Sequence, residues 1–230
     1  VPIVEVWQKP VVAIISTGNE IIPPGEPMQP ARVYDSNAQI LTDAVTELGG
    51  EPIRLGIAPD DLSALREKLT HALECADIVL LSGGTSKGAG DVSYRVVAEL
   101  ADPGIVAHGV ALKPGKPICL AATRGRAVVV LPGFPTSAIF TFHEFVAPII
   151  RRLAGKGTAE RTEVSARLAV KVNSEIGRTE YLLVGLVAID GKPEPSLVAY
   201  PMGQGSGSVT TFSRADGFAT IDRHDEILEA

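Results

Sequence analysis

The chain has 230 residues, 45% of them hydrophobic and 21% charged, and a formal net charge of −6 at pH 7. These values are typical of a folded globular protein with one large domain or two small ones, and they argue against disorder. The negative charge excludes a protein that coats nucleic acid, because no basic stripe is present to neutralise phosphates.

Membrane and secretion signals are missing from the sequence. No charge-free apolar run approaches the roughly 20 residues of a membrane span, and the start of the chain lacks a signal-peptide pattern. We therefore expect a cytoplasmic protein with no membrane and no nucleic-acid partner. Because the chain begins with Val1 rather than methionine, we also expect it to be a piece of a longer polypeptide.

Strands and helices alternate along the first part of the chain. An apolar run over residues 11–15 is typical of a buried strand. A helix is expected from about Asp35 to the glycines at 49–50, and a second strand over residues 51–58. Asp60 is placed to cap the helix that follows.

A third strand leads into a glycine-rich loop. Residues 78–81 form a continuous apolar run, and Asp91 is placed to cap a helix after the loop. Small side chains in the loop leave backbone N–H groups free to approach an anion. Strand, loop and helix start together are typical of phosphate binding. The candidate binding residues of this loop are Gly83, Gly84, Thr85, Ser86, Lys87 and Gly88.

The next elements include a turn with two lysines. Strands are expected over residues 105–112 and 117–121, joined by a turn that contains Lys113 and Lys116. The lysines offer point charges for an anion, although a plain solvated turn explains them equally well. Another buried strand at 127–131 precedes Pro132 and Gly133, and a helix over residues 136–153 is expected to be disturbed at Pro148.

The pattern changes after residue 155. Helical periodicity gives way to alternating runs at 166–172, 181–189 and 209–212, and Asp190-Gly191 is a strong hairpin signal. We therefore predict two domains. The first, residues 1–155, is a three-layer α/β/α domain with a mostly parallel sheet, and the second, residues 156–230, is a small all-β barrel or sandwich.

The carboxyl ends of the parallel strands are the expected binding edge. Ligands of such sheets lie beyond these ends, which would gather Glu20, Asp60 and the loop at 83–91 on one rim. The Gly84–Gly88 segment also matches the nucleophile-elbow pattern of serine hydrolases. That reading requires an acid and a histidine, and no histidine here has a distinctive context.

Five motifs follow one another along the chain. They are STGNE at 16–20, YDSN at 34–37, GGTSKGAGD at 83–91, KPGKP at 113–117 and PGFP at 132–135. With these motifs the chain resembles MoeA-type molybdopterin molybdenumtransferases. The resemblance covers essentially the whole chain, and it matches only the last two domains of the family, the MogA-like domain and the C-terminal β-barrel. It implies insertion of molybdate into adenylylated molybdopterin, with Mg²⁺ present and release of AMP.

The resemblance also implies residue roles. Asp91 and Glu20 match acidic positions and are our candidates for contact with the metal, and Asp60 and Lys113 complete the candidate catalytic set. The candidate substrate-binding residues are those of the glycine loop with Lys116, Pro132, Gly133, Arg178 and Ser206. The family's cleft lies between the α/β domain of one subunit and the barrel of its partner, so a homodimer is expected.

Departures from the family pattern leave alternatives open. Asn19 stands where the family has aspartate, Phe134 replaces the asparagine of PGNP, and Gly109 sits where some members carry a lysine. Tungstate therefore stays open as the oxyanion. Three other functions also stay open: a molybdopterin-binding module without turnover, a scaffold, and a molybdopterin adenylyltransferase that consumes ATP.

Overall fold

A six-stranded sheet forms the centre of the first part of the chain, in the order β4-β1-β5-β9-β8-β6. The computed structural model describes residues 3–84, 92–158, 162–189, 196–203 and 209–229. Strands β4, β1, β5 and β9 run parallel, and β8 runs antiparallel to both of its neighbours. The predicted mostly parallel sheet is confirmed. The strands are β1 (Val11–Thr17), β4 (Glu51–Ala58), β5 (Ile78–Ser82), β6 (Pro103–His108), β8 (Cys119–Thr123) and β9 (Arg126–Leu131).

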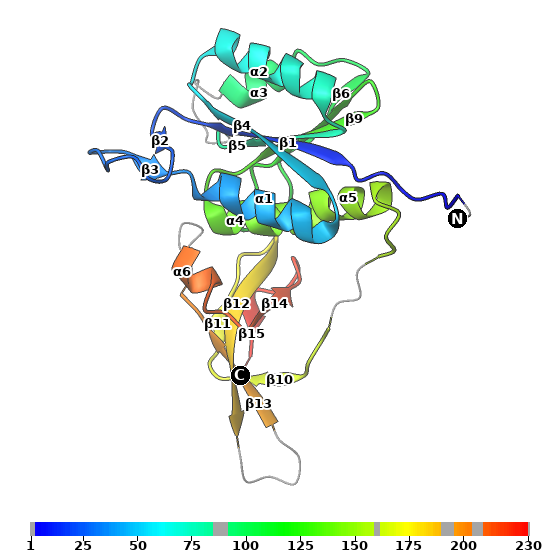
Figure 1. Cartoon of the computed structure of the whole chain (residues 1–230). Coiled ribbons are helices and arrows are strands. Elements are labelled where there is room, and N and C mark those ends of the chain that lie inside the picture. Colours follow the sequence, from blue (N-terminus) through cyan, green and yellow to red (C-terminus); the bar gives the residue numbers. More distant parts are fainter. Residues whose placement is uncertain (1–2, 85–91, 159–161, 190–195, 204–208, 230) are drawn as a thin grey trace.

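Helices cover both faces of this sheet and complete the α/β domain, as Figure 1 shows. Because side chains alternate along a strand, Val12 and Ile14 pack towards α1, whereas Ala13 and Ile15 pack towards α2. A central strand must therefore be apolar at every position, as the sequence indicated. One face carries α1 (Ser36–Leu48), α4 (Pro135–Thr141), the π-helical turn η1 (Phe142–Val146) and α5 (Ala147–Leu153), and the other carries α2 (Leu62–Cys75) and α3 (Val92–Val97).

The predicted disturbance of the last helix is confirmed. Pro148 has no backbone N–H for the usual bond to the preceding turn. The wider π turn η1 lies just before it, at Phe142–Val146, which is where an α-helix accommodates such a break.

Two element predictions in the α/β domain are wrong. The cap of α2 is Asp61, whose side chain accepts a hydrogen bond from the Ala64 amide at 2.8 Å, and not Asp60. The strand expected over residues 105–112 ends at His108, because Gly109 turns the chain with a φ of +81°.

The second part of the chain is a β domain. Its main sheet has the order β10-β13-β12-β14, with β7 (Leu112–Lys113) also pairing with β12. Its small core is built around Leu182, Val184 and Ile221. The predicted β fold is confirmed. The strands are β10 (Ala166–Leu168), β12 (Thr179–Ile189), β13 (Ser196–Pro201) and β14 (Gly217–Ile221), and a further pair joins β11 (Val172–Asn173) to β15 (Ile227–Leu228).

One strand prediction in the β domain is wrong. Residues 209–212 form the one-turn helix α6 (Val209–Phe212). The Phe212 ring lies 5.9 Å from that of Phe140. The helical turn therefore contacts the α/β domain through Phe212. The predicted hairpin residues Asp190 and Gly191 lie outside the described residues, whereas the strands on either side, β12 and β13, do pair antiparallel.

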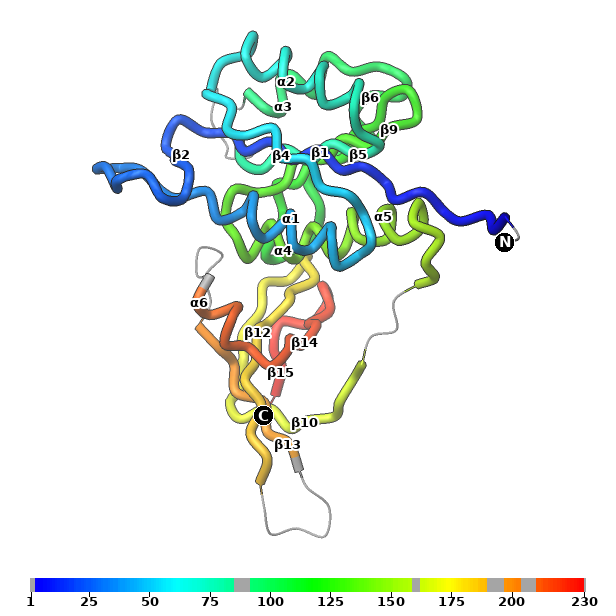
Figure 2. Tube along the Cα trace, viewed as in Figure 1, coloured from blue at the N-terminus to red at the C-terminus, as the bar shows by residue number. Residues whose placement is uncertain are grey.

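The two domains are joined by a shared ladder and a cluster of aromatic rings. Strand β7 comes from the α/β domain but pairs with β12, with Lys113 opposite Glu180. Phe140 of α4 stacks on Tyr181 at 5.0 Å and meets Phe218 edge-on at 5.3 Å. Figure 2 shows the β domain directly below α4. Both contacts link residues of the α/β domain to residues of the β domain.

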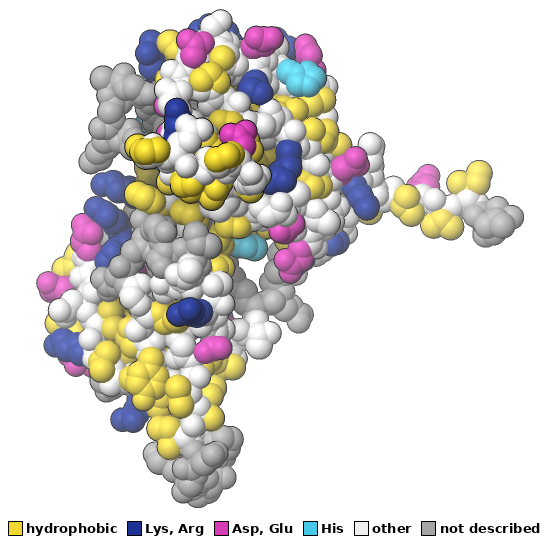
Figure 3. All heavy atoms as spheres, turned by 60° about the vertical axis from the view of Figure 1, so that its left-hand side comes forward, with side chains coloured by type: hydrophobic (Ala, Val, Ile, Leu, Met, Phe, Trp, Pro, Cys, Tyr) yellow, Lys and Arg dark blue, Asp and Glu magenta, His cyan; other side chains and the backbone are white. Residues whose placement is uncertain are grey.

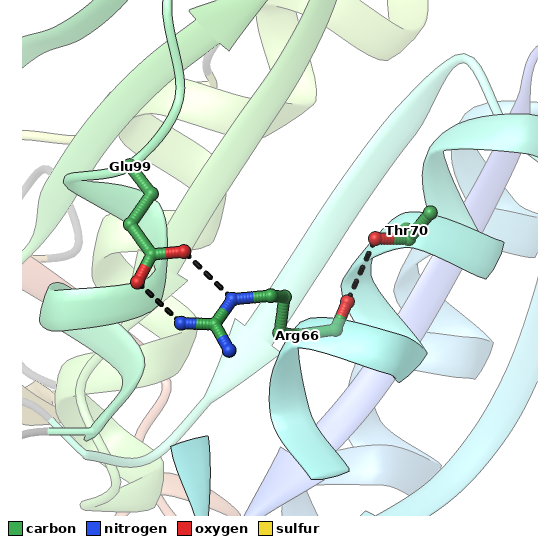
Figure 4. Close-up of polar contacts among 3 residues, drawn as sticks. All are labelled: Arg66, Thr70 and Glu99. Atoms are coloured by element: carbon green, nitrogen blue, oxygen red, sulfur yellow. Dashed lines mark hydrogen bonds and ion pairs between the residues drawn. The ribbon is translucent and has the colours of Figure 1, made fainter. Parts of the chain in front are cut away.

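An exposed ion pair links α2 to the segment after α3 (Figure 4). The Arg66 guanidinium donates to both carboxylate oxygens of Glu99, at 2.7 and 2.6 Å. The hydrogen bond from Arg66 lowers the pKa of the Glu99 carboxyl below its ordinary value of 4.5.

Strand β2 (Ile21–Ile22) pairs with β3 (Val33–Tyr34) beside the end of β1. Among the described residues, no helix is both long and apolar enough to cross a bilayer.

Candidate functional site

A cleft of about 970 Å³ lies where the α/β domain meets the β domain. Figure 3 shows basic and hydrophobic side chains close to this junction. The cleft follows the carboxyl ends of β1, β5 and β9, and β12 supplies its opposite wall. The residues predicted from the sequence that line it are Glu20, Gly83, Gly84, Lys113, Lys116, Pro132, Gly133 and Arg178.

The remaining predicted residues are not placed in the cleft. Asp60 is not among its described lining residues, and its carboxylate accepts a hydrogen bond from the Asn19 amide at 3.1 Å. The other predicted positions lie outside the described residues: Thr85, Ser86, Lys87, Gly88, Asp91 and Ser206.

Lys113 lies in the cleft with a carboxylate partner that the sequence analysis missed. Its ammonium is 3.0 Å from the carboxylate of Glu180, which also accepts a hydrogen bond from the Ser174 hydroxyl at 2.7 Å. Glu180 is only 3% exposed. Side chains of β12 point alternately inward and outward, so Glu180 lies on the same buried face as Leu182. This alternation in the sequence could have identified Glu180 as a buried carboxylate.

Among the described cations of the cleft, Lys116 is the one with an uncompensated charge. Arg178 has a partner, since its guanidinium lies 3.0 Å from the Glu175 carboxylate. Lys116 is exposed, and no carboxylate among the described residues pairs with it. Among the described residues of the cleft, a bound anion would therefore meet its strongest attraction at Lys116.

Glycines are required where β5 ends. Gly83 has a φ of +112°, and a Cβ there would collide with the Thr17 backbone oxygen. Gly84 has a φ of +69°, and a Cβ there would meet the Ser93 hydroxyl. These contacts are structural reasons for the two glycines, in addition to any role in binding phosphate.

Asn37 ties three parts of the α/β domain together beside the cleft. Its amide nitrogen donates to the Ser82 hydroxyl at the end of β5 and to the Gly133 carbonyl after β9, both at 2.9 Å. Asn37 is the last residue of the YDSN motif, and Asp35 in the same motif caps α1 by accepting from the Ala38 amide at 3.0 Å. The motif therefore positions the cleft floor, a role that the sequence analysis did not assign.

The carboxylates of the cleft offer an incomplete set of ligands for Mg²⁺. Asp35 caps α1 and Glu180 is paired with Lys113, which leaves the exposed Glu20. Over the described ranges, no three His, Cys, Asp or Glu side chains gather into a group that could hold a metal. Mg²⁺ needs several oxygen ligands, so the predicted metal site depends on Asp91, which lies outside these ranges.

Apolar side chains form much of the rest of the cleft. Phe134 is 62% exposed at its edge, and Leu182, Leu183 and Met202 contribute from the β domain. Such a surface suits a flat ring system, whereas the lysine turn suits an anion.

Comparison with known proteins shows two matched regions. Residues 13–152 match the family described as "Probable molybdopterin binding domain", and residues 165–230 match "MoeA C-terminal region (domain IV)". These regions are the α/β domain and the β domain, so the cleft lies between two matched units.

Curated relatives and solved structures agree with these matches. A molybdopterin molybdenumtransferase of Nostoc sp. is 37% identical over 194 residues, which are 83% of this chain and 44% of the relative. Molybdopterin molybdenumtransferase 2 of Mycobacterium tuberculosis is 33% identical over 178 residues, 74% of this chain and 43% of the relative.

The crystal structure of the molybdopterin biosynthesis MoeA protein from Pyrococcus horikosii aligns with a TM-score of 0.80 and 40% identity. The alignment covers 96% of this chain and 52% of that one. The chain therefore spans about half the length of these three relatives.

Proposed function

The chain belongs to the MoeA-type family of molybdopterin-binding proteins, and from this premise we propose that it acts in molybdenum cofactor biosynthesis. In this proposal it inserts molybdate into adenylylated molybdopterin and releases AMP. The relatives whose names describe a molybdenumtransferase are about twice as long as this chain. Molybdate insertion is therefore proposed for the protein to which these two domains belong.

The observation that carries the proposal is the composition of the cleft between the two matched domains. Lys116 and Arg178 place positive charge on one side, where molybdate and the phosphates would bind. Apolar side chains, among them Phe134 and Leu183, offer the other side to a ring system. A phosphorylated pterin with an attached nucleotide has both kinds of surface.

Each candidate residue then has a task. Lys116 binds the oxyanion directly, while Lys113 is held by Glu180 and orients the turn that carries Lys116. Asp60 supports the loop that ends in Glu20 through Asn19. Mg²⁺ would be held by Glu20 together with Asp91, and when bound it would offset the charge of the phosphates.

A homodimer in the cytoplasm is part of the same proposal. The family resemblance places the cleft across two subunits, whereas here the two domains of one chain already supply walls on both sides. A second subunit would then close the cleft further rather than create it. Tungstate in place of molybdate stays within the proposal, because Asn19 and Phe134 alter the surroundings of the rim.

A binding module without turnover is the second candidate. It is favoured by the carboxylates of the cleft, because among the described lining residues Glu20 alone is not already engaged as a helix cap or in an ion pair. The test is to incubate the chain with adenylylated molybdopterin, Mg²⁺ and molybdate or tungstate, and to follow AMP beside an Asp91→Ala variant. Oxyanion-dependent AMP release that the variant loses supports the transferase. Tight binding without AMP supports the module, and consumption of ATP with free molybdopterin would indicate the adenylyltransferase instead.

A further inference from the structure

Two buried polar atoms at the floor of the cleft have no hydrogen-bond partner in the described part of the chain. They are Oδ1 of Asn37 and Oγ of Ser16. Asn37 is 8% exposed and Ser16 3% exposed, and both residues line the cleft. A buried polar atom without a partner costs free energy, so these atoms mark a place where a bound molecule would supply the missing bonds.

The direction in which Asn37 presents its oxygen is determined by its neighbours. The Gly133 carbonyl can only accept a hydrogen bond, so the side-chain atom 2.9 Å from it must be the amide nitrogen. The same nitrogen donates to the Ser82 hydroxyl. Both donor hydrogens of Asn37 are therefore used within the protein, and Oδ1 is left as a pure acceptor.

Ser16 lies on the same face of the sheet as this acceptor. Ser16 of β1 is in register with Ser82 of the neighbouring parallel strand β5. Paired residues of adjacent strands project to the same face, and Ser82 is bonded to Asn37 on that face. The two unpartnered oxygens thus belong to one polar patch at the strand ends, which we call the acceptor patch and which comprises Ser16, Asn37 and Ser82.

The acceptor patch and the lysine turn call for opposite ligand chemistry. An unprotonated oxygen of molybdate or of a phosphate ester has no hydrogen to donate to Asn37 Oδ1, so such an oxygen cannot supply the hydrogen bond that this atom lacks. We propose that Asn37 Oδ1, with Ser16 Oγ, accepts hydrogen bonds from the exocyclic amino group of a nitrogen heterocycle. The inference rests on the proposed function, whose substrate contains two such rings, the pterin and the adenine.

Paired probes test this inference and identify the ring. The binding of pterin and of AMP to the 230-residue chain is compared with that of N2,N2-dimethylpterin and N6,N6-dimethyl-AMP, which lack the amino hydrogens. For the ring that occupies the patch, we expect methylation to weaken binding to the wild-type chain about tenfold, the value of one good hydrogen bond. The other pair should show no such loss.

Substitutions distinguish loss of the hydrogen bond to the amino group from steric hindrance by the added methyl groups. Ser16→Ala removes an unpartnered hydroxyl, so its Tm should equal or exceed that of the wild type. Asn37→Ala also loses the bonds to Ser82 and Gly133, and its Tm should fall. In both variants the preference for the unmethylated probe should shrink towards onefold. Thr123→Ala is the control, because it loses a partly buried hydrogen bond to the Ala101 carbonyl, away from the cleft, and should lower Tm without changing the preference.

The outcomes also distinguish this inference from the proposed function. Equal binding of methylated and unmethylated probes, or a preference that survives in both cleft variants, would overturn the acceptor patch. If AMP release from adenylylated molybdopterin nevertheless proceeds, only the inference fails. A preference that depends on Asn37 in a chain without any transfer activity would support the patch and count against the transferase.

Discussion

Asn19 and Asp60 bind each other through a reciprocal pair of hydrogen bonds. The backbone N–H of Asn19 donates to the Asp60 carboxylate at 3.1 Å, and the backbone N–H of Asp60 donates to the side-chain oxygen of Asn19 at 3.2 Å. The pair connects the loop after β1 to the loop after β4. Since Glu20 follows Asn19 directly, the position of this cleft carboxylate depends on a residue that is not itself among the cleft's described lining residues.

Asp60→Ala is therefore expected to affect both stability and activity. It should lower the free energy of unfolding by about 1 kcal/mol through the lost hydrogen bond, and it should slow AMP release by loosening the loop that carries Glu20. Urea unfolding and AMP assays measure the two effects. The neighbouring Asp61→Ala is the control: loss of the α2 cap costs about 1 kcal/mol as well but should leave turnover unchanged. Equal turnover in both variants would contradict the role of Asp60.

Lys113 and Glu180 are expected to behave as one unit. Among the described residues, Lys113→Met leaves the buried Glu180 carboxylate with the Ser174 hydroxyl as its one side-chain partner, which should cost about 2 to 3 kcal/mol in unfolding free energy. Adding Glu180→Gln should restore most of that loss, because no buried charge then lacks a partner. Chemical denaturation of the two single variants and the double variant measures the coupling. Additive losses would show that the pair contributes little.

Lys116→Ala is expected to impair anion chemistry without unfolding the chain. Its charge has no carboxylate partner among the described residues, so Tm should stay the same. AMP release should fall about 100-fold, as when one stabilising group near a developing negative charge is removed. Lys9→Ala, which removes an exposed lysine near the start of the chain, is the control for net charge. A similar fall in the control would point to long-range electrostatics instead.

Phe134→Ala is expected to weaken the binding of the ring system. The side chain is 62% exposed at the edge of the cleft, so its loss should hardly change the stability. Contact with an aromatic ring is worth about fivefold in affinity, which titration with adenylylated molybdopterin can detect. Phe134→Tyr keeps the ring and should bind like the wild type. If the Ala and Tyr variants bind alike, Phe134 does not contact the ligand.

The exposed pair Arg66–Glu99 is expected to give a pH-dependent contribution to stability. Arg66 lowers the pKa of Glu99 in the folded state. The stabilisation by the ion pair is therefore fully present above the unfolded-state pKa, which is the ordinary value of 4.5, and it is lost as pH falls through the folded-state pKa. The Tm difference between wild type and Arg66→Gln should be present at neutral pH and vanish in acid. A difference that grows on acidification would have the wrong sign for this mechanism.

Strong local patterns made much of the α/β domain predictable. Continuous apolar runs located β1, β5 and β9, and the glycines at 49–50 marked the end of α1. The cap of α2 was misplaced by one residue, because Asp60 and Asp61 look alike in sequence and only the bond to Asn19 separates their roles. The run at 209–212 is β-branched and aromatic, which favours a strand, but here it forms a helical turn whose Phe212 packs on Phe140.

The sequence predicted which residues belong to the candidate site, but it did not predict which of its cations have carboxylate partners. The KPGKP motif located Lys113 and Lys116, the family resemblance implied Arg178, and all three line the cleft. Which of them carries an unpaired charge depends on Glu175, Glu180 and the crossing of β7 to another sheet. That crossing joins residues 67 positions apart, a distance at which local patterns give no information.

Strand β7 also bears on the order in which the protein is made. Leu112 and Lys113 leave the ribosome before any residue of the β domain, yet they pair with Thr179 and Glu180 in its main sheet. An α/β domain that folds first during synthesis would hold this short strand ready as a template for the start of β12. If the chain were cut between the two domains, the sheet of the β domain would lose β7, the strand that pairs with the start of β12.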